Sequence, residues 1–168
     1  MITVTPTTAD DAEILAGIQK EAFRPLYERY HDERNPHLRG AEDITRRLNR
    51  AEYRYFTIRE DGKIVGGIYY VCTGSTPFLP VLAADECYLG RIYIAPERQG
   101  NHIAREAIRM TVDKFPAARR FYVDFPMDLE KNRRCYASAG FRDTGRRMEI
   151  ENGKLTLAFY CMEREVQK

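Results

Sequence analysis

The segment from Leu89 to Ala104 suggests a binding chemistry more clearly than any other part of this sequence. An apolar run that predicts a strand leads into a turn at residues 96–100, and an apolar helical pattern begins at Ile103. The first amides of a helix have no partners within the helix, and the helix dipole adds partial positive charge there. Gly100 would let the backbone approach a ligand closely. The segment therefore predicts an anion site, most naturally for a pyrophosphate.

This segment differs from two common phosphate-binding loops. No G-K-[ST] follows the glycine, which excludes a Walker loop, and no G-x-G-x-x-G occurs in it. A plain strand–turn–helix connection that binds nothing is the alternative interpretation of the same residues.

Composition excludes several other chemistries. The three histidines, His31, His37 and His102, cannot form the H-E-x-x-H motif of zinc proteases. The four cysteines contain no C-x-x-C pair, so neither a cysteine-rich zinc site nor a thioredoxin-like motif is expected. Neither Ser75 nor Ser138 lies in G-x-S-x-G, the motif of many serine hydrolases. We therefore expect no metal site and no serine nucleophile.

Length and charge bound the class of protein. The chain has 168 residues, which predicts a single domain over residues 1–168. It has 27 basic and 25 acidic residues, a net charge of +2, so no nucleic-acid-binding face is expected. The N-terminus lacks a signal-peptide pattern, and the longest apolar passage, Ile64 to Val71, is too short to cross a bilayer. We expect a soluble cytoplasmic protein with no membrane partner and with reduced thiols.

Hydrophobic periodicity predicts the elements around that segment. The first half should contain a strand at Ile2–Thr5, a helix from about Ala9 to Phe23 that Pro25 stops, and a short helix carrying Ile44 and Leu48. Residues 23–40, between the two helices, are too polar for the core and should form a short helix and a loop. Thr8 and Asp11 should form a capping box at the start of the first helix.

The remaining elements are marked by turns. Asp61-Gly62 and Asn152-Gly153 each predict a hairpin, and Gly66-Gly67 suggests a bulge or a close backbone approach. The expected segments are strands at 53–59, 64–71, 86–94, 121–125, 146–151 and 154–162, a helix of about four turns from Ile103, and a helix at 129–139. The order β-α-α-β-β-β-α-β-α-β-β indicates a mixed sheet with helices on its faces.

Two motifs in this order resemble the GCN5-related N-acetyltransferases, the GNAT family. The run P-E-R-Q-G-N-H-I-A is similar to motif A, [QR]-x-x-G-x-[GA], with Gln99 first and Ala104 last. His102 stands where the middle glycine is usual, so its side chain must point away from the phosphates or the loop must shift. Asn132 with Tyr136-x-x-x-Gly140-Phe141 is similar to the N…Y-x-x-x-G-F segment of the family. The predicted element order matches the family over the whole chain.

The resemblance implies the fold and the cofactor. The fold would be α/β (α+β), with a mostly antiparallel sheet of about 6–7 strands and helices on both faces. Acetyl-CoA would be the acyl donor and would lie where the motif A strand separates from the strand that holds Asp124. Backbone groups of Ile92 and Ile94 would pair with its pantetheine arm, and Asn132 would bond the pantetheine or a nearby carbonyl. The pyrophosphate would be held by the amides of Gln99, Gly100, Asn101, His102, Ile103 and Ala104.

The chemistry of amine acetylation requires a base, an oxyanion donor and an acid. An amine of pKa ~10.4 is protonated at neutral pH and cannot attack until a base takes its proton. The Ile94 amide is placed to donate to the oxyanion, and Tyr136, near the thioester sulfur, could protonate the thiolate. Where some family members carry a carboxylate, this chain has Tyr88. Glu86 is therefore the candidate base, Asp124 is the second candidate, and a water chain is the third.

We therefore expect an acetyl-CoA-dependent N-acetyltransferase that acts on a primary amine of a small molecule or a protein, by direct attack in a ternary complex. A non-catalytic acyl-CoA-binding or sensor module of the same fold is the first alternative. An interaction protein that uses residues 23–40 is the second. The acceptor pocket should come from residues 23–40 and 73–85, whose aromatic and mixed-charge content suggests a polar acceptor, with zwitterions among the candidates. The resemblance also allows a homodimer.

Overall fold

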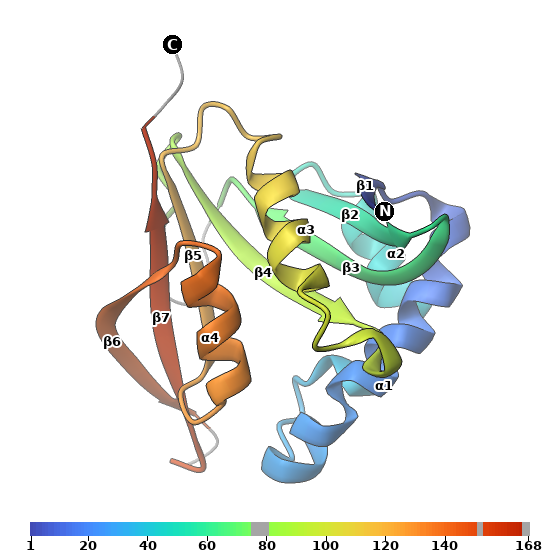
Figure 1. Ribbon diagram of the computed structural model, residues 1–168. Coiled ribbons are helices and arrows are strands. Elements are labelled where there is room, and N and C mark those ends of the chain that lie inside the picture. Colours follow the sequence, from blue (N-terminus) through green and yellow to red (C-terminus); the bar gives the residue numbers. More distant parts are fainter. Residues whose placement is uncertain (75–80, 151–152, 166–168) are drawn as a thin grey trace.

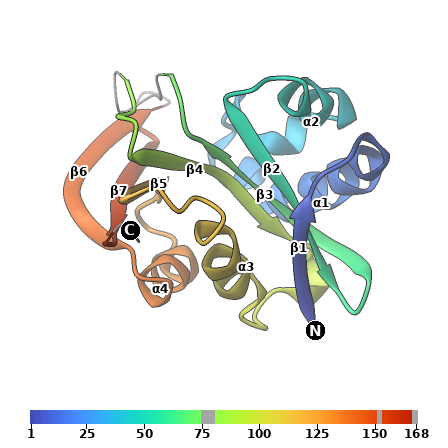
Figure 2. The same ribbon diagram turned by 90° about the horizontal axis from the view of Figure 1, so that it is seen from above.

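The computed structural model describes residues 1–74, 81–150 and 153–165. They form one seven-stranded sheet in the order β1-β2-β3-β4-β5-β7-β6, in which β4 and β5 are parallel and the other neighbours are antiparallel. Helices α1 and α2 cover one face, and α3 and α4 cover the other (Figures 1 and 2). The expected mixed, mostly antiparallel sheet with helices on both faces is confirmed.

The elements follow the predicted order. They are β1 (Ile2–Pro6), α1 (Ala12–Tyr30), α2 (Ala41–Leu48), β2 (Tyr53–Glu60), β3 (Lys63–Val71), β4 (Glu86–Ile94), α3 (Ile103–Val112), β5 (Arg120–Pro126), α4 (Glu130–Ser138), β6 (Arg142–Ile150) and β7 (Leu155–Glu163). Short 3-10 turns lie at Ala9–Asp11, Pro36–Leu38 and Pro96–Arg98. In this described part of the chain, no helix is long and apolar enough to cross a membrane.

Each face of the sheet has its own core. Between the sheet and α3 and α4, the largest cluster includes Ile68, Leu89, Ile108, Phe121 and Phe141. Beneath α1 and α2, a second cluster contains Leu15, Ile44, Tyr55, Tyr69 and Tyr93. A third packs the C-terminal part of α1 against β7 and contains Tyr30, Leu155, Leu157 and Phe159. A residue of the first cluster therefore lies on the face of the sheet that α3 and α4 cover, and a residue of the second lies on the face that α1 and α2 cover.

The prediction that Pro25 stops the first helix is wrong. Helix α1 continues to Tyr30 and ends at His31, which is left-handed (φ 51°) and donates its N–H to the Tyr27 carbonyl at 2.8 Å. Pro25 lies on the exposed side, where water can bond the carbonyl that the missing N–H leaves free. The turn beyond it is anchored, because Tyr30 is 9% exposed and its hydroxyl donates to Asp128 Oδ1 at 2.5 Å. Tertiary contact overrides the local signal, and residues 23–40 do contribute to the core.

The capping box and the hairpins form largely as predicted. Thr8 and Asp11 form the capping box. Asp61 and Gly62 both have positive φ, 50° and 85°, which suits the tight turn between β2 and β3. In the second hairpin β6 begins at Arg142, four residues earlier than expected, and Asn152 lies outside the described residues. Helix α3 is also shorter than predicted, with 10 residues rather than about four turns.

Gly66 and Gly67 show both features that the sequence suggested. The register of β2 and β3 shifts between Ile58 and Arg59, opposite this part of β3, which is a β-bulge. A Cβ on Gly66 would lie 2.2 Å from the Tyr93 carbonyl oxygen. The glycines therefore let β3 and β4 pack closely just before the turn into α3.

Candidate active site

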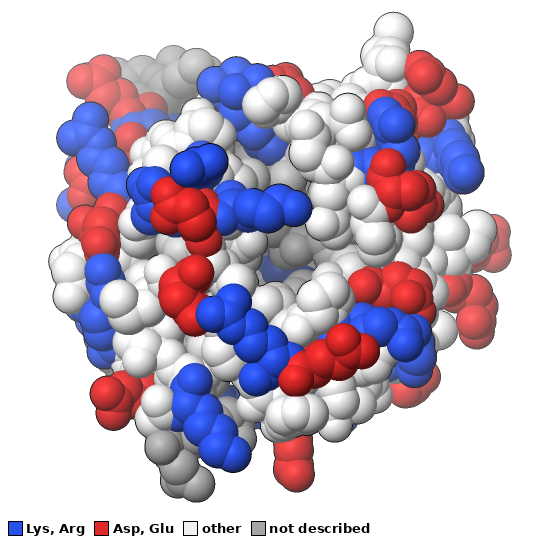
Figure 3. Space-filling model, turned by 60° about the horizontal axis from the view of Figure 1, so that its bottom comes forward, with Lys and Arg blue, Asp and Glu red and all other residues white. Residues whose placement is uncertain are grey.

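Strands β4 and β5 pair at one end and separate at the other. Their ladder covers only Glu86–Tyr88 and Arg120–Tyr122, although β5 continues to pair with β7 as far as Pro126. Beyond the ladder, β4 runs toward α3 and β5 toward α4 (Figure 1). Figure 3 looks onto the molecule with its lower end turned forward and shows a hollow in the middle, with charged side chains of both signs around it. The separation exposes two strand edges to a common opening.

The β4 edge of this opening carries the backbone groups of Ile92 and Ile94. The Ala95 N–H donates to the Val65 carbonyl of β3 at 2.8 Å. Backbone groups of alternate residues point in opposite directions in an antiparallel strand, so those of Ile92 and Ile94 face away from β3. The Gln99 side chain donates to the Ile94 carbonyl at 2.9 Å. Gln99 thus shapes the end of the strand, and the Ile94 N–H stays directed into the opening.

Gly90 forms a bulge in β4. Tyr69 pairs with Arg91 but Tyr70 pairs with Leu89, so Gly90 is an extra residue on β4. A Cβ on Gly90 would lie 2.2 Å from the ring of Tyr69, which leaves no room for a side chain. The bulge changes the alternation of the strand, because Cys87, Leu89, Ile92 and Ile94 all contact the α3 side of the sheet.

The turn after β4 presents backbone amides at the start of α3. Gly100 (φ 84°) and His102 (φ 60°) are both left-handed, a conformation that glycine adopts freely and histidine tolerates better than most residues. That conformation explains why His102 can occupy a place where glycine is usual, with its side chain exposed. The first α-helical hydrogen bond runs from the Glu106 N–H to the His102 carbonyl at 3.1 Å. The Gln99 N–H already donates to the Pro96 carbonyl at 3.4 Å, so of the predicted set the amides from Gly100 onward are the ones that precede this bond without a backbone partner of their own, and anion binding there stays a prediction.

Side chains at this turn fix its shape and add a cation. The Asn101 amide donates to the Arg98 carbonyl at 3.1 Å, which holds the turn closed. Arg105, in the first turn of α3, has a buried Nε with no hydrogen-bond partner in the described part of the chain, and this atom lies 3.8 Å from Glu106 Oε1. Burial raises the pKa of the Cys135 thiol in α4, and the positive charge of Arg105 lowers it. The sequence analysis missed Arg105, although a basic residue directly after motif A was a readable signal.

Helix α4 supplies Tyr136 and Asn132 from one side. Asn132 is half-buried and lies one turn before Tyr136, which is 7% exposed and packs on the rings of Phe125 and Phe141 at 5.1 and 5.7 Å. Burial raises the pKa of Tyr136 well above its usual value, and the nearby Cys135 and Asp124 raise it further. The phenol is therefore held in its protonated form, and no described residue accepts a hydrogen bond from its hydroxyl.

Asp124 is a buried carboxyl without a partner for one oxygen. It lies two residues beyond the last residue of β5 that pairs with β4. Val123 and Phe125 belong to the core under α3 and α4, so the Asp124 side chain starts from the other face of the sheet. Its Oδ2 has no hydrogen-bond partner among the described residues. Burial raises the pKa of Asp124 to about 7, although the positive charge of Arg34 lowers it.

Glu86, the first candidate base, already accepts two hydrogen bonds and lies far along β4 from the bulge at Gly90. Its Oε1 accepts the Ala83 N–H at 2.9 Å, and its Oε2 accepts the Tyr122 hydroxyl at 2.8 Å. Glu86 begins β4, four residues before Gly90, which at about 3.3 Å per residue is roughly 13 Å along the strand. Glu86 therefore lies at the closed end of the β4–β5 ladder, whereas Asp124 lies beyond the ladder, where the two strands separate.

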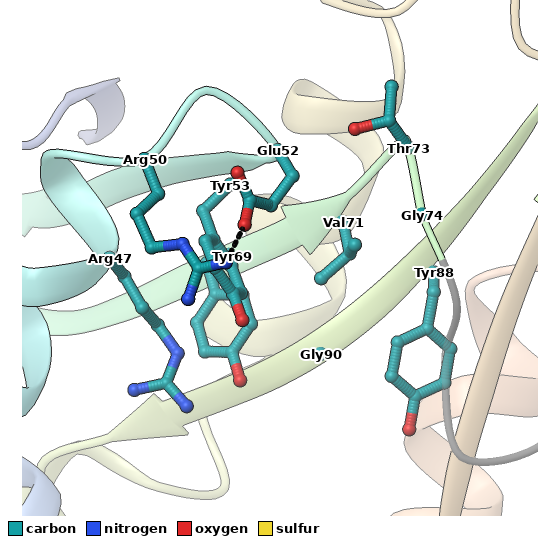
Figure 4. A pocket seen from close by; sticks show the side chains of 10 residues that line it. All are labelled: Arg47, Arg50, Glu52, Tyr53, Tyr69, Val71, Thr73, Gly74, Tyr88 and Gly90. Atoms are coloured by element: carbon teal, nitrogen blue, oxygen red, sulfur yellow. Dashed lines mark ion pairs between the residues drawn. The ribbon is translucent and has the colours of Figure 1, made fainter.

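A cavity of about 600 Å³ lies against β3 and β4 on the α1 and α2 side (Figure 4). Tyr88 and Gly90 form part of its wall, so it reaches the bulge next to the opening. Of the predicted acceptor segments, 73–85 contributes Thr73 and Gly74, and 23–40 contributes nothing. The remaining lining residues are Arg47, Arg50, Glu52, Tyr53, Tyr69 and Val71. The sequence analysis missed the charged residues of α2 and of the turn that follows it.

Solved structures show the same fold. The chain aligns with the ribosomal-protein-S18-alanine N-acetyltransferase from Escherichia coli at 13% identity, covering 100% of this chain and 97% of that one, with a TM-score of 0.73. The chain also aligns with AAC(6')-Ib in complex with ribostamycin and coenzyme A at 14% identity, covering 97% of this chain and 93% of that one, with a TM-score of 0.76. For YncA from Salmonella typhimurium with its cofactor acetyl-CoA, the identity is 18%, the alignment covers 99% of this chain and 95% of that one, and the TM-score is 0.71.

The sequence comparisons add the family. No curated protein matches the chain. A sequence model described as the acetyltransferase (GNAT) family matches residues 15–141, which include the turn after β4, Asp124 and Tyr136. That match covers well over half of the chain and agrees with the fold, so the chain belongs to the acetyltransferase (GNAT) family.

Proposed function

We propose that this protein transfers the acetyl group of acetyl-CoA to a primary amine of a small molecule or a protein, by direct attack in a ternary complex. The observation that carries the proposal is the opening between β4 and β5. One wall presents the edge of β4 at Ile92 and Ile94, and the other carries Asp124, two residues beyond the ladder, with Tyr136 of α4 packed on the neighbouring Phe125. The family and the fold agree with this assignment.

The residues present fit acetyl-CoA. The amides from Gly100 to Ala104 would hold the pyrophosphate at the N-terminus of α3, the Gln99 N–H being bonded to Pro96, and the Arg105 guanidinium would add positive charge beside them. The edge of β4 at Ile92 and Ile94 would pair with the pantetheine arm, and Asn132 would bond that arm or a nearby carbonyl. When bound, acetyl-CoA supplies a thioester carbonyl as the electrophile. Solved structures of similar fold contain coenzyme A or acetyl-CoA, which supports the same donor here.

Three groups would then act on the reaction. Asp124 takes the proton of the incoming ammonium group, because a carboxyl with a pKa of about 7 is both ionised and basic enough near neutral pH. The Ile94 N–H donates to the carbonyl oxygen as negative charge develops on it. Tyr136, which stays protonated, donates its proton to the departing sulfur. Glu86 and a water chain stay as the competing proposals for the base.

A thiol-release assay with acetyl-CoA and a broad amine library tests this proposal. We expect turnover with at least one amine class. In Tyr136→Phe, which keeps the ring, kcat and kcat/KM should fall by a similar factor, about 10². Calorimetry should show nearly unchanged acetyl-CoA affinity in that variant. If the variant kept more than about half of the wild-type kcat with chemistry rate-limiting, Tyr136 would be only a packing residue.

The same assay separates the alternatives. Binding of acetyl-CoA without turnover on any amine would favour a non-catalytic acyl-CoA sensor. Absence of any binding of coenzyme A would favour an interaction protein.

A further inference from the structure

The cavity beside Gly90 carries more positive charge than its acids neutralise. Arg47 and Arg50 line it, and Glu52 is the single acid among the lining residues that the structure describes. Glu52 Oε1 lies 2.6 Å from Arg50 Nη2. Arg47 therefore depends on an acid outside the lining, which is Asp43, at 2.6 Å from its Nη1.

Asp43 is shared among three arginines. Its carboxylate lies 2.6 Å from Arg46, 2.6 Å from Arg47 and 3.2 Å from Arg91. Burial would raise the pKa of Asp43, but Arg47 and Arg91 together hold it below its usual value. With Arg50 and Glu52 included, four guanidinium groups face two carboxylates in the described part of the chain. Arg46 and Arg91 are not among the described lining residues, so Arg47 and Arg50 against Glu52 leave one positive charge at this side of the cavity.

Arg47 is fixed and incompletely bonded. Its side chain is only 14% exposed, and its guanidinium lies 5.4 and 5.0 Å from the ring centres of Tyr53 and Tyr69. Its Nε is buried without a hydrogen-bond partner among the described residues. An unsatisfied buried donor on a cation is costly, and an anionic acceptor in the cavity would satisfy it.

The cavity is also polarised along its length. Figure 4 shows Arg47 and Arg50 together at one end, the rings of Tyr53 and Tyr69 beside them, and Tyr88 and Gly90 toward the other end. The volume of about 600 Å³ suits a small molecule. A ligand held by its anionic group at the arginines would lay its apolar part against the tyrosine rings and turn a group next to the anion toward the bulge of β4.

We propose that the acceptor is a small amine that carries a carboxylate, an amino acid with an apolar or aromatic side chain, held at its carboxylate by Arg47 and Arg50. This inference rests on the proposed function. The amine nitrogen forms the new bond to the acetyl carbon, the carbon–sulfur bond breaks, the amine proton passes to Asp124, and the thiolate receives a proton. A polyamine would instead bring positive charge against the two arginines, so it is a poor acceptor.

Matched acceptors test the carboxylate directly. Wild-type protein is assayed for thiol release with L-phenylalanine, L-phenylalaninamide and phenethylamine, and the same sets are made for leucine and tyrosine. The amide keeps the shape and has a less basic amine, so solution chemistry alone favours it. We expect kcat/KM for the amino acid to exceed that for its amide by at least about tenfold, as hydrogen bonds to charged groups allow.

Two arginine variants assign that preference to the cavity. Arg50→Gln, at a side chain that is 56% exposed, should reduce the preference for the carboxylate to about threefold or less, through a loss of kcat/KM on the amino acid. Arg46→Gln is the control, because it removes the same charge from α2 at a residue that does not line the cavity. It should keep the wild-type preference. Equal loss in both variants would show a general charge effect and overturn the assignment to the cavity.

The remaining outcomes separate this inference from the proposed function. Turnover on neutral amines or spermidine that equals or exceeds turnover on amino acids overturns the inference and leaves the acetyltransferase proposal standing. A preference for O-phosphoethanolamine over every amino acid assigns the arginines to phosphate and also overturns it. If no amine is acetylated, the function fails. Calorimetry with L-phenylalanine then decides the inference: binding that weakens in Arg50→Gln supports it, and absence of binding overturns it.

Discussion

The two faces of the sheet contribute to the site in different ways. On the α3 and α4 side, the predicted donor site consists mainly of backbone: the edge of β4 and the amides at the start of α3, all within residues 92–105. On the α1 and α2 side, the groups are side chains from separate elements: Arg47 of α2, Tyr69 of β3, Tyr88 of β4 and Asp124 of β5. A contiguous loop can build the first arrangement, whereas only the complete fold can build the second.

This difference implies different sensitivities to mutation. Backbone groups survive most substitutions, so the donor site should respond only to added charge or to changed backbone conformation. Side-chain groups are lost by a single substitution, so the acceptor side should respond to replacements that alter neither size nor fold. The predictions below test that contrast, beginning with the largest expected effect.

Asp124→Asn should lower kcat/KM by about 10²–10⁴, because the amide has nearly the same shape and cannot take a proton. Steady-state kinetics with the best acceptor from the amine library would measure it. Glu86→Gln is the matched control, and it should change kcat/KM by no more than a few-fold because Glu86 is bonded to Ala83 and Tyr122. A large loss in the Glu86 variant with a normal Asp124 variant would assign the base to Glu86.

Gly100→Asp should abolish most of the rise in melting temperature that acetyl-CoA produces, since a like charge would face the pyrophosphate. A ligand that binds only the native state stabilises it by mass action, so thermal denaturation at fixed acetyl-CoA measures the loss. No atom lies within 4 Å of a Cβ built on Gly100 (φ 84°), so bulk alone should cost little. Gly100→Asn, which has the same backbone requirement and no charge, should retain most of the rise.

The outcomes of this pair are separable. Equal losses in the two variants would mean that the backbone conformation, and not charge, controls binding. An unchanged rise in both would exclude this turn from the donor site.

The buried carboxyl should also make the stability of the protein depend on pH. The pKa of Asp124 is raised from 3.8 to about 7 in the folded state, mainly by burial. Between these values the folded state holds the proton more tightly than the unfolded state. The contribution of Asp124 to stability is therefore complete below pH 3.8 and is lost as the pH rises to about 7, at up to about 1.4 kcal/mol per pH unit.

Chemical denaturation of wild type and Asp124→Asn from pH 4 to pH 8 checks this dependence. The difference in unfolding free energy should move in favour of the variant as the pH rises and should level off above pH 7. A constant difference over the whole range would show that Asp124 does not titrate in this interval. The stabilised variant would be the inactive one, so the same burial would serve activity and oppose stability.

His102→Gly should have the smallest effect. Glycine relieves the cost of a left-handed side-chain residue (φ 60°), about 1–2 kcal/mol, but adds backbone entropy to the unfolded chain, about 0.5–1 kcal/mol. The net change in unfolding free energy should therefore stay within about 1 kcal/mol, with turnover kept and acetyl-CoA affinity equal or higher. A hundredfold loss of turnover would instead make His102 part of the chemistry.

The sequence predicted the elements and the donor side because their signals are local. The turn residues Asp61 and Gly62, the apolar periodicity from Ile103, and the run from Gln99 to Ala104 each lie within a few residues of what they determine. The end of α1 could not be predicted in the same way. Pro25 is a local stop signal, but the contact that outweighs it joins Tyr30 to Asp128, 98 residues away.

The acceptor side was predicted less well for the same reason. Arg47, in a short amphipathic helix, and Arg50, in the turn that follows it, are ordinary surface-type residues in the sequence, and only the packing of α2 beside β2 brings them into one cavity with Tyr88. Asp124 was weighed as a base, yet its burial and its unpartnered oxygen follow from how β5 separates from β4. Such properties depend on what surrounds a residue and not on its neighbours along the chain.

The bulge at Gly90 divides β4 into two parts, in which residues of opposite parity in the sequence face the core. Before it, Leu89 points to the α3 core and Tyr88 to the cavity, whereas after it Ile92 takes the core position and Arg91 the opposite one. Deletion of Gly90 would therefore remove the bulge without exchanging the faces, because Leu89 and Arg91 would become neighbours that already point to opposite sides and Ile92 would stay on the core side. Deletion of one residue elsewhere in β4, away from the bulge, would instead exchange the two faces for part of the strand and should be tolerated far less.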